Sequence, residues 1–186
     1  MQDCTYHYLI GGILTGNEIA RQIRMGNIKI DPFDEKRLNP NSYNLRIAPE
    51  MKVYDTNTLD MKKNNKTKTI QIPEFGFTLR AHKLYLAHTV ETTWTDKFIP
   101  RIEGRSSMGR LGMITHASAG LGDIGFNGTW TLHIIPTIDV KIYPYEEIAQ
   151  LIFYTAVGDT SIMYDGHYQN QTDATASRMY QSMKGE

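Results

Sequence analysis

The chain has almost no cysteine, no long apolar run and no excess of charge of either sign. Cys4 is the only cysteine in 186 residues, which excludes an intrachain disulfide, a thiolate zinc cage and a CxxC redox pair. No apolar run approaches the roughly 20 residues of a membrane span, and the N-terminus lacks a basic-then-apolar signal pattern. We therefore expect a cytoplasmic protein without a membrane partner.

Charge balance limits the partners further. Twenty basic residues face twenty acidic ones, for a formal net charge of +0. Nucleic-acid polymers are usually bound through a broad basic surface, so neutrality argues against such a partner. A small anionic ligand would have to be held by a few local arginines. The length suits one domain that buries its own core.

The pattern of apolar residues predicts a mostly β protein with a short helix near its N-terminus. In "TGNEIARQIRMG", Thr15 and Glu18 form a capping-box pair, Ile19 and Ile23 share a face, and Gly26 suits the end of a helix. The following runs are rich in β-branched and aromatic residues and favour a sandwich or barrel of short strands. These runs are "NSYNLRI", "MKVYD", "KTIQI", "HKLYLAHTVETTWT", "TWTLHII", "VKIYP" and "AQLIFYT".

Composition divides the chain into three parts: an N-terminal extension (1–12), a β domain (13–158) and a flexible C-terminal lid or tail (159–186). The third part has few aliphatic residues and cannot bury enough apolar area to hold itself rigid. It is either a disordered tail or a lid that orders over a ligand. Within the β domain, the lysine-rich Met61–Lys68 is typical of a solvated hairpin loop, with a phosphate or nucleic-acid patch as the alternative.

The segment "EGRSSMGRLG" has the chemistry of a phosphate cradle. It places Arg105, Ser106, Ser107 and Arg110 within six residues, between glycines. Arginine offers a planar fork to phosphate oxygens, and hydroxyl and backbone N–H groups can donate beside it. A serine-arginine turn that only caps a helix is the alternative.

A second candidate segment is "GDIGFNGTWTLH". Its Gly and Asn content predicts a tight hairpin with Asp123 at its centre, where an Asp is often a structural Asx-turn residue. The glycines would leave backbone amides bare for a planar base. Strand alternation puts His133 on the face of Thr129 and Thr131, opposite Trp130, Leu132 and Ile134. His133 by itself is typical of a structural residue, and no ligand spacing supports a metal site made with His116 and Asp123.

Together these segments resemble the family of dCTP deaminases and trimeric dUTPases. The likeness is carried, in order, by "ILTGNEI", "LNPNSYNLRI", "GRSSMGRLG", "AGLGDIGFNGTWTL" and "HYQNQTDATASR". The resemblance implies a distorted β-barrel or jelly roll of the dUTPase-like type. It also implies a homotrimer with active sites shared between subunits. The expected ligand is a deoxynucleoside triphosphate that brings Mg²⁺ on its phosphates, without protein metal ligands.

The resemblance also assigns roles to single residues. It implies that Asp123 orients the attacking water and contacts the sugar, and that Phe126 stacks near the sugar. The backbone around Ala119, Gly120 and Gly122 would read the base. The phosphates would be held by Ser106, Ser107 and Arg110, with Arg105 supporting the same turn, while Gln150 lies next to the site and Tyr168 and Gln171 belong to a closing lid.

One position departs from the deaminase pattern. Family deaminases end the strand after the hairpin on "TLE", whereas this chain reads "TLH", so His133 stands where the resemblance places the catalytic carboxylate. General acid–base help is commonly worth about 10²–10⁴-fold in rate. The departure favours a Mg²⁺-dependent diphosphatase, foremost a dUTPase, with dCTP or a modified pyrimidine as variant substrates. The alternatives are a dCTP deaminase, alone or coupled to dUTPase activity, and a non-catalytic nucleotide-binding regulator.

Overall fold

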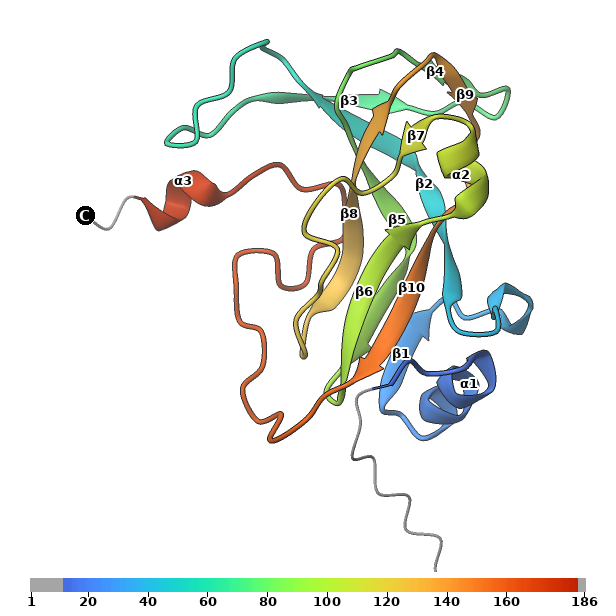
Figure 1. The fold of residues 1–186 in the computed structure, drawn as a ribbon. Coiled ribbons are helices and arrows are strands. Elements are labelled where there is room, and N and C mark those ends of the chain that lie inside the picture. Colours follow the sequence, from blue (N-terminus) through green and yellow to red (C-terminus); the bar gives the residue numbers. More distant parts are fainter. Residues whose placement is uncertain (1–11, 184–186) are drawn as a thin grey trace, which may run out of the picture.

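The computed structural model describes residues 12–183 and is built mainly from β-strands (Figure 1). The expected N-terminal extension, with Cys4, lies almost entirely outside the described residues. The elements are α1 (Gly16–Arg24), β1 (Ile28–Asp31), η1 (Glu35–Arg37), β2 (Tyr43–Tyr54), β3 (Thr67–Gln71), β4 (Phe77–Leu79), β5 (Tyr85–Thr95), β6 (Phe98–Gly104), α2 (Ser106–Arg110), β7 (Met113–Ile114), β8 (Asn127–Pro136), β9 (Val140–Ile142), β10 (Glu147–Thr155) and α3 (Met179–Ser182).

Eight of the strands in the described region form one strongly curved sheet. Its main path runs β6-β10-β2-β5-β8-β7, with β1 added to β5 and β3 added to β2, while β4 and β9 form a separate pair. The pairings between these strands are all antiparallel in the described region, as short connections allow. This topology confirms the prediction of a mostly β, barrel-like fold with a short N-terminal helix.

The local predictions hold with two corrections. Thr15 caps α1 by accepting from the Glu18 amide at 3.3 Å, and Ile19 is fully buried. The Glu18 side chain does not complete the expected capping box, because its carboxylate pairs with Arg21 and Gln22. The segments "NSYNLRI" and "MKVYD" are not two strands; they belong to the single strand β2, which has an irregular register against β5 between Ile47 and Met51.

The core lies inside the curved sheet. Alternate residues of β2, β8 and β10 point inward, and the largest fully buried side chains include Tyr43, Leu132 and Phe153. The lysine-rich segment forms most of the loop between β2 and β3, as predicted, and reaches into β3. Lys63 pairs with Asp60, and Lys68, in β3, pairs with Asp55. Both lysine side chains remain mostly exposed, so the loop is a solvated turn.

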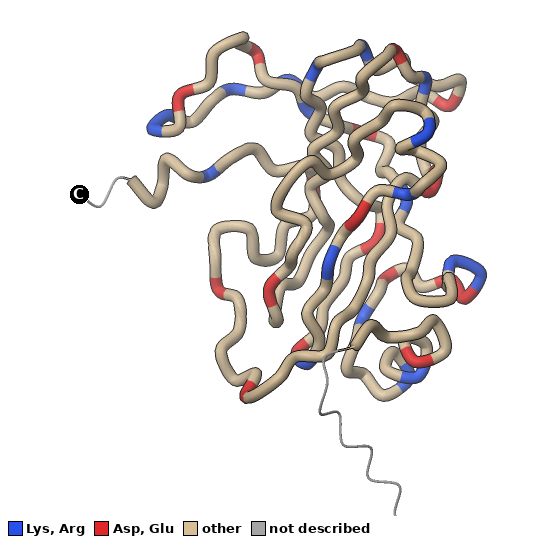
Figure 2. The backbone as a smooth tube through the Cα atoms, in the orientation of Figure 1, with Lys and Arg blue, Asp and Glu red and all other residues tan. Residues whose placement is uncertain are grey.

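Acidic and basic residues are interspersed along the backbone (Figure 2). Blue and red segments alternate around α1, η1 and the β2–β3 loop, in keeping with the balanced composition. Among the described helices, none combines the length and the apolar character needed to cross a membrane.

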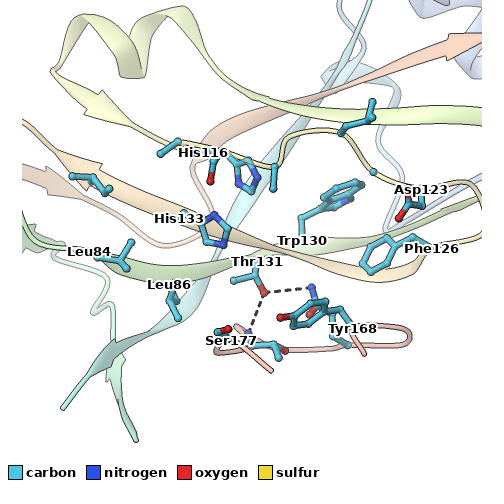
Figure 3. Close-up of a pocket in the computed structure, with 18 of the residues that line it drawn as sticks. Leu84, Leu86, His116, Asp123, Phe126, Trp130, Thr131, His133, Tyr168 and Ser177 are labelled. Carbon is cyan, nitrogen blue, oxygen red and sulfur yellow. Dashed lines mark hydrogen bonds between the residues drawn. The ribbon is translucent and has the colours of Figure 1, made fainter. Parts of the chain in front are cut away.

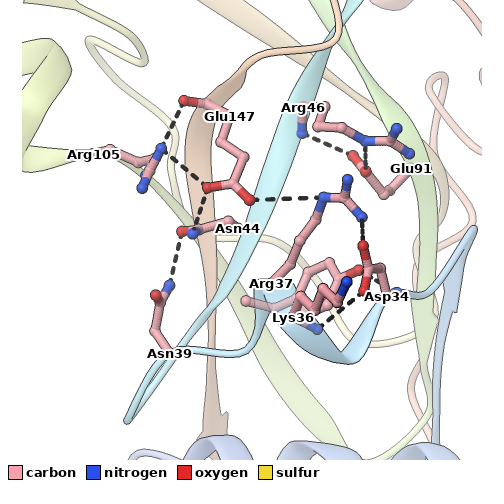
Figure 4. A network of polar contacts seen from close by, with 10 residues as sticks. Asp34, Lys36, Arg37, Asn39, Asn44, Arg46, Glu91, Arg105 and Glu147 are labelled. Carbon is pink, nitrogen blue, oxygen red and sulfur yellow. Dashed lines mark hydrogen bonds and ion pairs between the residues drawn. The ribbon is translucent and has the colours of Figure 1, made fainter.

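A buried ion pair joins β2 to β5 (Figure 4). The Glu91 side chain is fully buried and accepts from the Arg46 backbone N–H at 2.9 Å and from the Arg46 Nε at 2.7 Å. The pair sits beside the irregular register of the two strands. Two bonds to one carboxylate compensate for taking it out of water, so removal of either partner would lower the stability of the fold.

We expect Glu91→Ala to lower the free energy of unfolding by about 3–5 kcal/mol, because Arg46 would lose its partner in a largely dry site. Urea unfolding followed by circular dichroism measures this change. Glu74→Ala is the matched control, since Glu74 is exposed. A loss in Glu91→Ala no larger than in the control would contradict the role given to the pair.

Candidate functional site

A cavity of about 720 Å³ lies between β8, the loop that precedes it and the C-terminal segment. Figure 3 shows its polar groups at two ends: His116 and His133 at one, and Asp123, beside the Phe126 ring, at the other, with Trp130 between them. Most of the wall is apolar, with Leu84, just before β5, and Leu86, within it, beside the histidines. A pocket with an apolar wall and few polar groups is typical of a small-molecule site.

The alternation of β8 delivers the polar groups to the cavity. Trp130, Leu132 and Ile134 are buried, whereas Thr131 and His133 are half-buried and line the cavity. This confirms the predicted faces. Trp130 also reaches the cavity wall with its ring, while its indole N–H donates to the Thr93 hydroxyl at 2.8 Å.

His133 does not stand alone, because its ring stacks on that of His116. The ring centroids are 4.8 Å apart and the planes differ by 16°. Burial, and next the neighbouring His116, lower the pKa of His133; burial likewise lowers the pKa of His116. Because both pKa values lie below the ordinary value of about 6.5, burial favours the neutral form of each ring, and repulsion further disfavours a state in which both carry charge. Among the described residues, no three His, Cys, Asp or Glu side chains are grouped to hold a metal.

Asp123 begins a tight turn at the opposite end of the cavity. The Phe126 N–H donates to the Asp123 carbonyl at 3.2 Å, and Gly125 has φ +89°, a conformation that favours glycine. The predicted turn is therefore present, but it is not a tight hairpin: it lies in a long connection between β7 and β8, whose pairing is at Met113↔Pro136 and Ile114↔Ile135. The Phe126 ring lies 5.2 Å from that of Trp130.

The predicted base-reading backbone is only partly available. Ala119 and Gly122 line the cavity, but Gly120 is not among the lining residues. The Gly122 N–H already donates to the Pro100 carbonyl at 2.7 Å, and the Gly120 carbonyl accepts from Ile102 at 2.8 Å. These two bonds join the loop to β6, so the Gly122 N–H and the Gly120 carbonyl are not free to read a base. Base reading by the rest of this backbone stays a prediction.

The C-terminal segment covers the cavity from its own chain. Tyr168 and Gln171 line it, as the lid hypothesis requires. Gln171 donates from Nε2 to the Thr129 carbonyl at 2.7 Å and the Thr131 hydroxyl at 3.3 Å, and its own carbonyl accepts from the Thr129 N–H at 2.9 Å. Thr131 also accepts from the Thr175 N–H at 3.0 Å (Figure 3). The segment is thus bound to β8; its predicted flexibility stays a prediction.

The predicted phosphate cradle lies elsewhere in the chain. Ser106, Ser107 and Arg110 are exposed on α2, and none of them lines the cavity. In Figure 1, α2 and the C-terminal segment lie on opposite sides of β8. One chain therefore does not bring the two groups of predicted site residues together.

The base of α2 is held by a polar network (Figure 4). Arg105 donates from Nη1 to the Glu147 carbonyl at 3.0 Å and lies 3.1 Å from the Glu147 carboxylate, which also accepts from Asn44 at 2.8 Å. Gln150 bonds the Ser42 hydroxyl at 2.8 Å and the Gly104 carbonyl at 3.3 Å. Arg105 and Gln150 thus fix the strand that leads into α2.

Sequence reasoning missed several residues of the cavity. The alternation predicts that Thr131 shares the face of His133 but gives it no role. For His116 the sequence offers only a possible metal ligand, because stacking between residues 17 positions apart leaves no local pattern. Tyr54, Leu59 and Ser177 have no local signal, since they come from the end of β2, the β2–β3 loop and the C-terminal segment.

We expect stability to fall as the pH is lowered from about 7 to 5. The pKa values of His88, His116 and His133 are all lowered, chiefly by burial, so the unfolded chain takes up protons before the folded one does. Stability then rises with pH across this window and is lost as pH falls through the unfolded value of about 6.5. Urea unfolding at pH 7.5 and 5.5 measures the difference.

His133→Asn should shrink that difference, since it removes one of the three groups and the repulsion within the stacked pair. His82→Asn is the control, because His82 is exposed. The free energy of unfolding would change between pH 7.5 and 5.5 by the same amount in both variants if His133 did not contribute. That result would contradict the interpretation of His133 and His116 as a neutral pair.

Comparisons with known proteins agree on one family. The sequence profile described as "dCTP deaminase-like" matches residues 13–156. A Clostridium beijerinckii protein named "dCTP deaminase, dUMP-forming" is 48% identical over 172 residues, which cover 92% of this chain and 99% of that protein. A Leptospira biflexa protein of the same name is 45% identical over 172 residues, covering 92% and 98%.

A solved structure has a similar fold. The crystal structure of 2'-deoxycytidine 5'-triphosphate deaminase from Agrobacterium tumefaciens superposes with a TM-score of 0.64 at 16% identity, covering 78% of this chain and 49% of that one. At this identity the likeness concerns the fold alone. The profile match and the two relatives show that the chain belongs to the dCTP deaminase-like family.

Proposed function

We propose that the protein forms dUMP from dCTP, by deamination of the base and cleavage of the triphosphate. The observation that carries the proposal is the 48% identity, over 99% of its length, to a relative named "dCTP deaminase, dUMP-forming". The cavity supports it, because one chain places a carboxylate, a stacked histidine pair and an aromatic ring around a space suited to a nucleoside.

His133 is the group we assign to deamination. No described residue hydrogen-bonds its ring, burial keeps the pKa low, and one nitrogen of the neutral imidazole can accept a proton from water. The water oxygen would add to C4 of cytosine while one water proton passes through the imidazole to the departing 4-amino group. Ammonia would leave, the oxygen on C4 would become a carbonyl, and the second water proton would end on ring N3. A single imidazole nitrogen would then serve as both base and acid.

Asp123 is the group we assign to triphosphate cleavage. Its carboxylate is exposed to the cavity and would orient a water for in-line attack on the α-phosphorus, with pyrophosphate leaving. Gln171 would help to close the site, since its buried Oε1 has no partner among the described residues and can accept from a ligand. Tyr168 would cover the nucleotide beside it.

We further propose that Mg²⁺ enters on the phosphates. Asp123 is the only carboxylate among the described residues that line the cavity, which does not amount to a metal cage. Magnesium commonly keeps waters and binds through substrate phosphates, which this donor set fits. The ion would neutralise charge on the triphosphate.

The triphosphate also argues for an assembly with shared sites, which we propose to be a homotrimer. No Lys or Arg occurs among the described residues that line the cavity of one chain. The exposed Ser106, Ser107 and Arg110 on α2 are the matching unused donors. A second copy that brings its α2 to the cavity mouth would supply the missing positive charge.

A second candidate is a dUTP diphosphatase without deaminase activity. One observation favours it: a histidine stands where the family resemblance places the deaminating carboxylate. Triphosphate cleavage depends on Asp123 and the arginine-containing α2, both of which are present. The two candidates differ only in whether ammonia is released from dCTP.

The first test incubates the protein with Mg²⁺ and each of dCTP, dUTP, dTTP, dATP and dGTP. We expect dUMP and pyrophosphate from dCTP, with one ammonia for each pyrophosphate, measured by chromatography and an ammonia assay. Turnover of dUTP without ammonia from dCTP would leave only the diphosphatase candidate. Tight binding of nucleotides without any product would contradict both.

Asp123→Asn should reduce pyrophosphate release by about 10²-fold or more while nucleotide binding stays measurable, because a neutral amide orients water poorly. Isothermal titration with dUTP measures the binding and a pyrophosphate assay the turnover. Asp165→Asn is the control, since Asp165 is exposed on the C-terminal segment outside the cavity lining. Undiminished turnover in Asp123→Asn would refute the assigned role.

His133→Asn should suppress ammonia release from dCTP by about 10²–10⁴-fold while dUTP cleavage stays within about ten-fold of the original rate. The ratio of ammonia to pyrophosphate is the readout, and His82→Asn is again the control. Restoration of ammonia release in His133→Glu would show that the position needs a proton carrier. Equal loss of both activities in His133→Asn would contradict a role confined to the base.

A further inference from the structure

The turn that carries Asp123 is held largely by the C-terminal segment of its own chain. The Gly125 N–H donates to the Thr95 carbonyl at 2.8 Å, which ties the turn to the end of β5. The Ile124 carbonyl accepts from the Tyr164 N–H at 2.8 Å, and the Asn127 carbonyl accepts from the Asn170 N–H at 2.8 Å. Two backbone groups on either side of Phe126 therefore depend on residues some 40 positions away.

One side chain of that segment holds two more backbone groups of the turn. Gln169 donates from Nε2 to the Gly125 carbonyl at 2.9 Å and to the Tyr164 carbonyl at 3.0 Å. Its Oε1 accepts from the Asn127 N–H at 2.8 Å. A single carboxamide thus spans the two peptide groups that flank Phe126.

Packing leaves the turn little freedom to move. A Cβ at Gly125 would lie 2.7 Å from the Met163 Cβ, so the segment follows the bare backbone of the glycine closely. The Phe126 ring meets the Tyr164 ring edge-on at 5.9 Å. The turn and the segment fit together with little space between them, and motion of one moves the other.

We propose that Gln169 is a positioning residue, which fixes the direction of the Asp123 carboxylate by clamping the turn. The C-terminal segment then has two roles: it covers the nucleotide, and it holds the turn that carries Asp123 in place. The inference rests on the proposed function only in taking Asp123 as the group that orients water. A displacement of about 1 Å at such a group can cost about 10²-fold in rate.

The chemistry of the clamp requires glutamine. A glutamate would present two acceptors, and one of them would face the Gly125 carbonyl. An asparagine is one methylene shorter and cannot reach both peptide groups. A methionine keeps the length and volume but makes neither bond, so Gln169→Met isolates the hydrogen bonds from the packing.

The first experiment tests whether Gln169 holds the turn, in the absence of nucleotide. It measures amide hydrogen exchange in the full chain. In Gln169→Met the Asn127 amide should exchange about ten-fold faster or more, because its acceptor is lost. The Thr129 amide should keep its protection, since it donates to the Gln171 backbone carbonyl. Gln181→Met is the matched control, because Gln181 is exposed on α3, away from the turn.

The outcomes of that experiment are distinct. Faster exchange at Asn127 alone supports the clamp. Faster exchange at both Asn127 and Thr129 would mean that the whole segment has detached, which overturns a specific role for Gln169. Unchanged exchange at Asn127 overturns it as well.

The second experiment measures turnover of the nucleotide that the unaltered protein uses. Gln169→Met should lower kcat by about 10²-fold and leave KM within about three-fold, because the water-orienting group is misplaced while the nucleotide contacts persist. A raised KM with unchanged kcat would overturn the inference in favour of a nucleotide-binding role. If the unaltered protein turned over no nucleotide, the proposed function would fail, while the exchange experiment would still decide the clamp.

Discussion

The antiparallel pairing of β8 with β5 is the constraint on which the rest of the site depends. Its register sets His133 opposite Leu86 and Leu132 opposite Ala87. Because side chains alternate along a strand, a slip of one residue would turn His133 into the core and Leu132 into the cavity. The same pairing places the Leu86 side chain beside the histidine, so the apolar wall and the polar group of the cavity are fixed together.

Hydrogen bonds between residues far apart in the sequence attach the other segments of the site to this strand. Thr131 and Thr129 bind the C-terminal segment, and that segment in turn holds the turn with Asp123. His116 reaches β8 by stacking on His133. Each group is therefore placed by another part of the molecule and not by its own neighbours.

Much of the fold could be predicted from the sequence, because period-two alternation and β-branched composition are local signals. They located most strands and the helix that Thr15 caps. They failed where the tertiary structure decided: two predicted segments form the single strand β2, and the turn at Asp123 is not part of a tight hairpin. Residues of the candidate site were identified through the family resemblance, but Ser106, Ser107 and Arg110 lie outside the cavity that holds Asp123 and His133.

By itself the sequence determined the family and the faces of β8, since both depend on the local order of residues along the chain. It also placed His133 where the family resemblance puts a carboxylate. Only the tertiary structure decided that His133 stacks on His116, that the Gly122 amide is occupied, and that Gln169 clamps the turn. The physical reason is the same in all three cases. A hydrogen bond or a ring contact needs a partner at a few ångströms, and here those partners lie from 17 to more than 40 residues apart, which local patterns do not encode.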